Sequence, residues 1–120
     1  MKKALQAILM STSDEQWNDI LDKTKEITIR EGLREYAPGF CILTNIDVNR
    51  SVGVDITSVR HCKLKEVTNQ EYLEDNFRSR DDLYEGMREY YPSMTPDSDV
   101  TIIRWNGVRG KLFEDYIKSK

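Results

Sequence analysis

The segment Lys25-Glu26-Ile27-Thr28-Ile29-Arg30 alternates polar and apolar side chains. This period of two sends successive side chains to opposite faces of a β-sheet, so Ile27 and Ile29 are expected to face a core. A half-buried antiparallel strand with a solvated outer face gives the same pattern. The segment therefore predicts a strand and leaves open whether its polar side chains do chemistry.

A short helix is predicted immediately before this strand. Ser13-Asp14-Glu15-Gln16 has the form of a capping box, in which Ser13 caps the helix and Gln16 reaches back. Trp17, Ile20 and Leu21 follow on one helical face. The helix has to end near Lys25, where the strand begins.

Further elements are predicted along the rest of the chain. The proline and glycine of Pro38-Gly39 suit a type II turn, and a slip in the alternation after Ile56 predicts a β-bulge near Thr57 and Ser58. The remaining predicted elements are a strand over 40–46, a strand over 52–59, a helix capped by the box Thr68-Asn69-Gln70-Glu71, a helix capped by Ser79 and stopped by Pro92, and a central or helix-covered strand over 100–105.

Length and composition predict one ordinary globular domain. The chain has 120 residues, of which 32% are charged and 38% hydrophobic. The opening residues 1–10 form an apolar run too short for a signal peptide and are expected to form the first strand. No run approaches the roughly 20 apolar residues that cross a bilayer. We expect a cytoplasmic protein with a domain over 1–109 and an amphipathic helical tail over 110–120, whose apolar side could dock on the body or mediate self-association.

Cysteine and histidine usage predicts neither a disulfide nor a metal site. Cys41 and Cys62 are expected to be reduced and buried, because a chain of this size needs no bridge. His61 is the one histidine, and a satisfied histidine on a strand is a simpler interpretation than a zinc ligand beside the two cysteines. No cofactor is expected.

The net charge of −3 argues against a protein that coats nucleic acid through bulk electrostatics. The negative charge lies in the second half of the chain. A polyanion site would therefore draw on basic residues of the first half, of which Lys23, Lys25, Arg30 and Arg34 are the nearest in sequence, with Arg60, Lys63 and Lys65 as further candidates. Scattered solvated charge explains the same residues.

Several short motifs follow one another in a fixed order. They are Ile20-Leu21, Lys25 to Arg30, Tyr36-Ala37-Pro38-Gly39, Asp55 to Val59, Val67-Thr68, Asp75-Asn76-Phe77, Leu83, Tyr91-Pro92 and Val100 to Trp105. Each is unspecific alone, but in this joint order and spacing the chain resembles the ASCH family of small PUA-like β-barrel proteins. The resemblance covers roughly residues 3 to 106. It implies an α+β fold, a small mixed β-barrel with short helices across its openings and a cleft between barrel and helices.

The same resemblance implies a function linked to RNA or nucleotides. Some family members that are similar to this chain in the first motif are amidohydrolases that remove the acetyl group of N4-acetylcytidine with a lysine, a threonine and a glutamate. Lys25 and Thr28 match the first two positions, and Asp75 stands at the third. Two further departures are Lys23, where the family usually has glycine, and Phe40, where an aspartate is common.

These residues could perform the chemistry under one geometric condition. A threonine hydroxyl becomes a nucleophile when a base takes its proton, and Lys25 could be that base if it is neutral. In a regular strand, however, Lys25 and Thr28 would lie on opposite faces. Lys25 must therefore sit in the turn before the strand. Asp75 would act as general acid or would orient the lysine.

A binding module is the main alternative to the enzyme. The same cleft could hold a nucleoside, a nucleotide or single-stranded RNA, with Arg30 on a phosphate and Tyr36 or Tyr91 stacked on a base. A nuclease of the ASCH type is a third alternative, which no particular residues carry.

Overall fold

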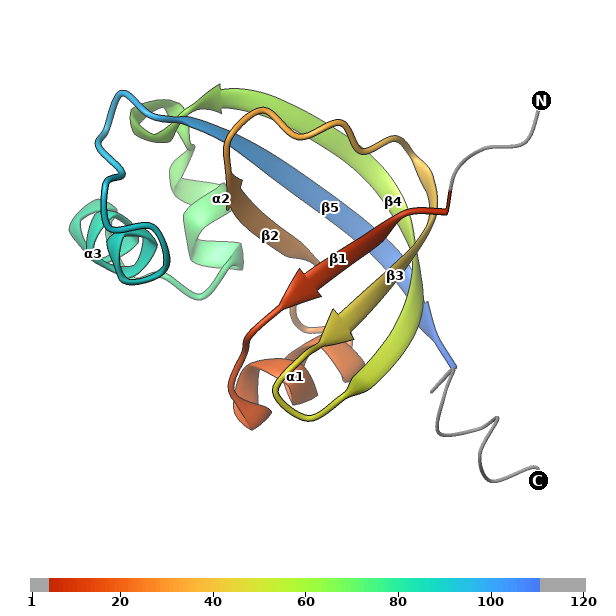
Figure 1. The fold of residues 1–120 in the computed structure, drawn as a ribbon. Coiled ribbons are helices and arrows are strands. Elements are labelled where there is room, and N and C mark those ends of the chain that lie inside the picture. Colours follow the sequence, from red (N-terminus) through yellow and green to blue (C-terminus); the bar gives the residue numbers. More distant parts are fainter. Residues whose placement is uncertain (1–4, 111–120) are drawn as a thin grey trace.

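The computed structural model describes residues 5–110, which form a curled sheet flanked by short helices (Figure 1). The strands are β1 (Ala7–Met10), β2 (Ile27–Glu31), β3 (Gly39–Asn45), β4 (Arg50–Lys63) and β5 (Asp99–Arg109). The helices are α1 (Asp14–Leu21), α2 (Asn69–Glu74) and α3 (Arg80–Tyr90), with a 3-10 turn η1 (Leu64–Glu66) before α2.

The five strands form one mixed sheet in the order β1-β3-β4-β5-β2. β1 runs parallel to β3, and the other pairs are antiparallel. The register of β4 against β5 shifts between Ile56 and Ser58, which confirms the predicted bulge, and again between Gly53 and Asp55. Bulges strengthen the local twist, so the sheet curls into a half-barrel whose edge strands are β1 and β2 (Figure 1). The predicted α+β, PUA-like architecture is confirmed.

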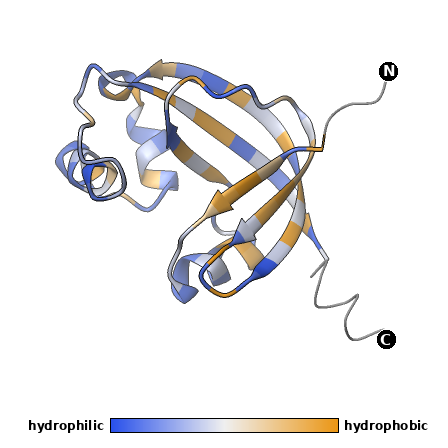
Figure 2. Cartoon of the chain, in the orientation of Figure 1, coloured by the Kyte–Doolittle hydropathy of each residue, from blue (hydrophilic) through white to orange (hydrophobic). Residues whose placement is uncertain are grey.

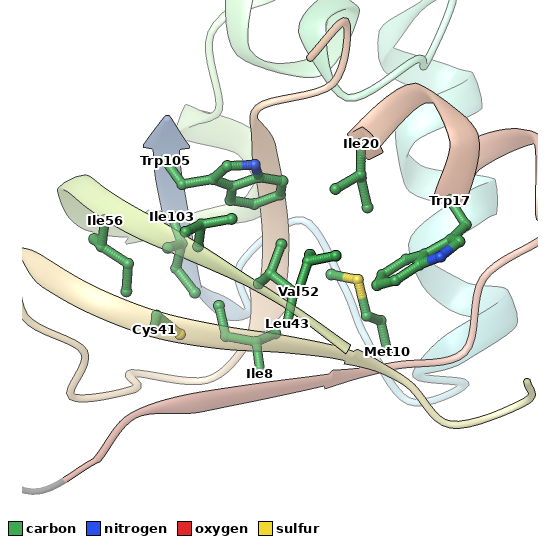
Figure 3. Packing of buried hydrophobic residues seen from close by; sticks show 11 residues of the cluster. Ile8, Met10, Trp17, Ile20, Cys41, Leu43, Val52, Ile56, Ile103 and Trp105 are labelled. Carbon is green, nitrogen blue, oxygen red and sulfur yellow. The ribbon is translucent and has the colours of Figure 1, made fainter. Parts of the chain in front are cut away.

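One hydrophobic core lies between the sheet and α1 (Figure 3). Trp17 and Ile20 of the predicted helical stripe are buried in it, and Leu21 packs partly buried against it. They meet apolar residues of β1, β3, β4 and β5. These include Ile8, Leu43, Val52, Ile103 and Trp105. Helix α1 therefore closes one opening of the half-barrel.

A second hydrophobic core lies at the other opening, under α2 and α3. Leu83 and Met87 of α3 pack there with Ile27 and Ile29 of β2. The neighbouring residues Ile102 and Ile103 of β5 belong to different cores, which confirms that both faces of this central strand are covered. Figure 2 shows the apolar residues concentrated on the strands, with polar residues prominent on the helices.

The predicted caps are present, with one difference. Ser79 accepts a hydrogen bond from the backbone of Asp82, and Thr68 and Glu71 form the reciprocal capping box of α2. Ser13 caps α1 through the backbone N–H of Gln16. The side chain of Gln16 does not complete the box, because its amide oxygen binds other side chains.

Both cysteines are free, but only Cys41 is fully buried, and Cys62 is partly exposed. The prediction that both are buried is therefore wrong for Cys62, which lies near the end of β4. Burial raises the pKa of the Cys41 thiol to about 11. His61 is satisfied by a hydrogen bond between its Nε2 and the Arg34 carbonyl.

Two predictions concern the ends of the chain. The helical tail predicted for 110–120 lies, beyond Gly110, outside the described residues. No helix within 5–110 is long and apolar enough to cross a membrane.

Candidate functional site

A cleft of about 510 Å³ lies where the two edge strands of the half-barrel meet the helices. One side comes from β1 and from residues 11–12, and another from Lys25 and β2. Residues from α1, from the loop after α2 and from α3 complete it. The polar residues lining the cleft are Ser11, Thr12, Gln16, Lys25, Thr28, Arg30, Asp75, Asn76, Asp82, Glu85, Glu89, Tyr90 and Tyr91.

The end of α1 delivers Lys25 into this cleft. Lys23 follows the C-cap of the helix with a φ of 67°, the left-handed conformation that often terminates helices. The backbone N–H groups of Thr24 and Lys25 then both donate to the Asp19 carbonyl. Lys25 thus precedes β2, which begins at Ile27. The alternation of side chains between the two faces of the strand therefore does not fix the direction of the Lys25 side chain. The geometric condition set by the sequence is met.

Lys25 and Asp75 form a buried ion pair. The Lys25 Nζ lies 2.5 Å from the Asp75 Oδ1, and each side chain is less than one-tenth exposed. Asp75 is the C-cap of α2, so that helix sets its position. Burial raises the pKa of the Asp75 carboxyl. Three influences lower this pKa without cancelling the effect of burial: the nearby Lys25, a backbone hydrogen bond from Ile29, and the charge of Arg30. Asp75 is therefore a buried carboxyl group whose pKa lies above its ordinary value.

Thr28 lies in the same cleft, on β2. Thr28 is only 7% exposed, although a solvated outer face was expected for this strand. The hydrogen bonds formed by the Lys25 nitrogen go to Gln16 and Asp75, and none joins it to the Thr28 hydroxyl among the described residues. The three residues share one cleft, with Lys25 held by the acid.

Arg30 and Tyr91 also line the cleft, whereas Tyr36 does not. The Arg30 Nη2 donates to the Leu9 carbonyl at 2.6 Å and so joins the two edge strands. Its Nε is buried without a hydrogen-bond partner. The Tyr36 hydroxyl donates to the Ala7 carbonyl, and its ring packs against the α1 core.

Sequence reasoning missed the contributions of α1 and α3 to the cleft. Gln16 accepts a hydrogen bond from Lys25, although its position suggested only a cap. Asp82, Glu85 and Glu89 of α3 line the cleft and give it acidic character, and Tyr90 is a large exposed ring there. The sequence shows that these acids share one helix, but it does not show which surface of the protein that helix packs against.

The basic residues of the first half do not gather into one polyanion surface. Arg60 is paired with Glu71, Lys63 with Asp99 and Lys65 with Asp97. Of the candidates, Lys25 and Arg30 reach the cleft. No group of three metal-binding side chains occurs within residues 5–110.

A second hollow, of about 690 Å³, lies between α1 and the β3–β4 hairpin. Its lining includes Trp17, Leu21, Val48 and Arg50. Within the described part of the chain, this lining holds no buried pair of acid and base. The cleft around Lys25 is therefore the stronger candidate.

Comparison with known proteins shows similarity at the level of structure. An ASCH domain from Lactobacillus crispatus superimposes with a TM-score of 0.65 at 16% identity, covering 88% of this chain and 79% of the other. A DUF984 protein from Enterococcus faecalis gives 0.66 at 12% identity, with coverages of 90% and 82%. An ASCH protein from Zymomonas mobilis gives 0.63 at 13% identity, with coverages of 95% and 80%.

Neither a protein-family model nor a curated protein sequence matches the chain. At these low identities the structural likeness shows the fold alone. The chain has the fold of the ASCH domain structures, which confirms at the level of the fold the resemblance seen in the sequence.

Proposed function

We propose that the cleft binds a nucleobase and that Lys25, Thr28 and Asp75 hydrolyse the acetyl amide of N4-acetylcytidine. The observation that carries this proposal is the buried Lys25–Asp75 pair beside Thr28 in an open cleft. Removing two charges from water costs several kcal/mol per ion, so a buried pair is a poor device for stability. A buried acid with a shifted pKa in a cleft is typical of a catalytic site.

The proposed reaction follows from the proton positions. Within the buried pair, Lys25 passes a proton to Asp75 across the 2.5 Å contact and becomes a neutral amine. The amine takes the Thr28 hydroxyl proton while the Thr28 oxygen attacks the acetyl carbonyl carbon. The bond from that carbon to the cytidine nitrogen breaks, and the nitrogen takes its proton from Asp75. Water then hydrolyses the threonine ester, releasing acetate.

The shorter acid of this chain is compatible with the reaction. Aspartate has one methylene fewer than the glutamate expected from the family, but Asp75 already contacts the Lys25 nitrogen at 2.5 Å. Positioning within about 0.5 Å matters for a catalytic group, and this contact is what allows the shorter acid to act on the lysine.

The charges around the cleft favour a small ligand over a long nucleic acid. Arg30 places a positive charge in the lining of the cleft, and Tyr91 offers a ring. Asp82, Glu85 and Glu89 on α3 repel a phosphate backbone. The proposed substrate is therefore a nucleoside or a single nucleotide.

Substitution of Asp75 tests the proposal. Asp75→Asn removes the proton carrier and should lower the rate of cytidine release from N4-acetylcytidine by about 100-fold or more, in the range typical of general acid catalysis. Asp81→Asn, at an exposed position in the first turn of α3, is the matched control and should keep the wild-type rate. Equal rates for Asp75→Asn and wild type would contradict the assigned role.

A binding module without catalysis is the second candidate. The observation that favours it is that the Lys25 nitrogen is engaged by Gln16 and Asp75 rather than by Thr28. In that case wild type and Asp75→Asn would both release no cytidine, and a labelled single-stranded RNA or nucleotide would bind with an affinity that falls as salt rises. A nuclease would instead cleave that RNA.

A further inference from the structure

Gln16 uses its side chain in the cleft rather than at the end of its helix. It is the third residue of α1, where a capping-box side chain would bind the backbone of Ser13. Its Oε1 instead accepts hydrogen bonds from the Thr12 hydroxyl at 3.1 Å and from the Lys25 Nζ at 3.5 Å. The side chain is partly buried and lines the cleft. Gln16 thus gives up a stabilising cap interaction to contact the proposed base.

The chemistry of an amide suits this contact. A lysine nitrogen donates hydrogen bonds both as an ammonium and as a neutral amine, so the neutral Gln16 oxygen can hold Lys25 in either state. The Asp75 carboxylate attracts the ammonium much more strongly than the amine. A charged lysine nitrogen can donate hydrogen bonds but cannot accept them. The contact therefore orients the Gln16 amide so that its oxygen, and not its NH₂ group, faces Lys25.

We propose that Gln16 is a positioning residue that holds the Lys25 nitrogen in the cleft while its proton moves to Asp75. Thr12 fixes the orientation of the Gln16 amide. Glutamate would serve a capping box equally well at this place, but its charge would pin Lys25 as an ammonium. The inference rests on the proposed function for its effect on turnover, whereas the contact between Gln16 and Lys25 can be tested without it.

Other charged groups line the same cleft and are unchanged in every variant of the test. They are Asp75 at the end of α2, Arg30 on β2, and Asp82, Glu85 and Glu89 on α3. A difference between variants at position 16 therefore reports Gln16 itself.

The first experiment follows the ionisation of Lys25 by NMR of its labelled side chain. Gln16→Glu should raise the titration midpoint of Lys25 by about one pH unit or more, as a neighbouring opposite charge does. Gln70→Glu, a change of the same kind at an exposed helical position, should leave the midpoint unchanged. An unchanged midpoint in folded Gln16→Glu would overturn the proposed contact.

The second experiment measures hydrolysis of N4-acetylcytidine. Gln16→Met keeps the length of the side chain and should lower kcat about 10-fold or more with little change in KM, whereas Gln70→Met should have no effect. Thr12→Val should show a smaller loss in the same direction. If Gln16→Met and wild type have the same kcat, the positioning role is wrong. If wild type is inactive while Gln16→Glu still shifts the Lys25 midpoint, the proposed function fails and the contact stands.

Discussion

Lys23 occupies a backbone conformation that suits glycine. Its φ of 67° lies in the left-handed region, which a residue with a Cβ adopts at a cost. The resemblance noted in the sequence implies a glycine at this place, and Lys23 adopts a backbone angle that glycine accepts without steric cost. In this chain, Lys23 reverses the backbone direction after α1, and Lys25 then enters the cleft. The sequence showed the departure, but only the backbone angle shows its consequence.

Lys23→Gly should therefore stabilise the protein. Relief of the left-handed strain outweighs the larger entropy of an unfolded glycine chain, and a net gain of about 0.5–1 kcal/mol in the free energy of unfolding is expected. Urea denaturation measures it. Asn49→Gly is the control, because Asn49 also has positive φ but asparagine tolerates this region. A loss of stability in Lys23→Gly would contradict the strain.

The elements adjacent to the cleft were predictable where the signal was local. The strand at Ile27, the bulge near Thr57 and the box of Thr68 with Glu71 each rest on neighbouring residues. Gln16 could not be predicted in the same way. Its position relative to Ser13 does fit a capping box. The Gln16 side chain, however, binds Lys25, nine residues further along the chain, and a local sequence pattern does not reveal that contact.

Helix α2 depends on a carboxylate that should make the protein sensitive to acid. Burial alone would raise the pKa of Glu71, but hydrogen bonds from Arg60 and Thr68 outweigh it and lower the pKa. A lowered pKa stabilises the fold above the unfolded value, near roughly pH 4.3. This contribution is lost as the pH falls through the lower folded value.

Denaturation at a series of pH values tests this dependence. The difference in stability between wild type and Glu71→Gln should be largest above about pH 5 and should shrink as the pH falls below about 4. Exposed Glu35→Gln is the control and should show little pH-dependent difference. A constant difference between wild type and Glu71→Gln across this range would show that ionised Glu71 contributes nothing special.

Across the whole molecule, the order of motifs predicted the fold, and the structure brings most of the proposed site residues together. Lys25, Thr28, Arg30, Asp75 and Tyr91 do line one cleft. The ring proposed at Tyr36 lies elsewhere, because the chain after β2 crosses to the α1 core. The acidic residues of α3 line the cleft because tertiary packing places this helix beside the edge strands. The sequence pattern of α3 alone does not show that packing.

Arg30 links the two edges of the half-barrel. Its hydrogen bond to the Leu9 carbonyl connects β2 to β1, strands that lie at opposite ends of the sheet order. Arg30→Met should reduce the free energy of unfolding by about 1.5–3 kcal/mol, the range for a hydrogen bond from a charged group. Arg34→Met is the control, since the Arg34 guanidinium donates to the Glu31 carbonyl, three residues away in the same segment. Equal losses in both variants would argue against a special role for this link.

We propose that Thr28 is the nucleophile of an amidohydrolase. The most direct test is the rate of cytidine release from N4-acetylcytidine by wild type, by Thr28→Ala and by Thr57→Ala, an exposed control on β4. Wild type and Thr57→Ala should turn over at the same rate, and Thr28→Ala should lose about a thousandfold or more. A wild-type rate no faster than buffer, or a Thr28→Ala rate equal to wild type, would contradict the account.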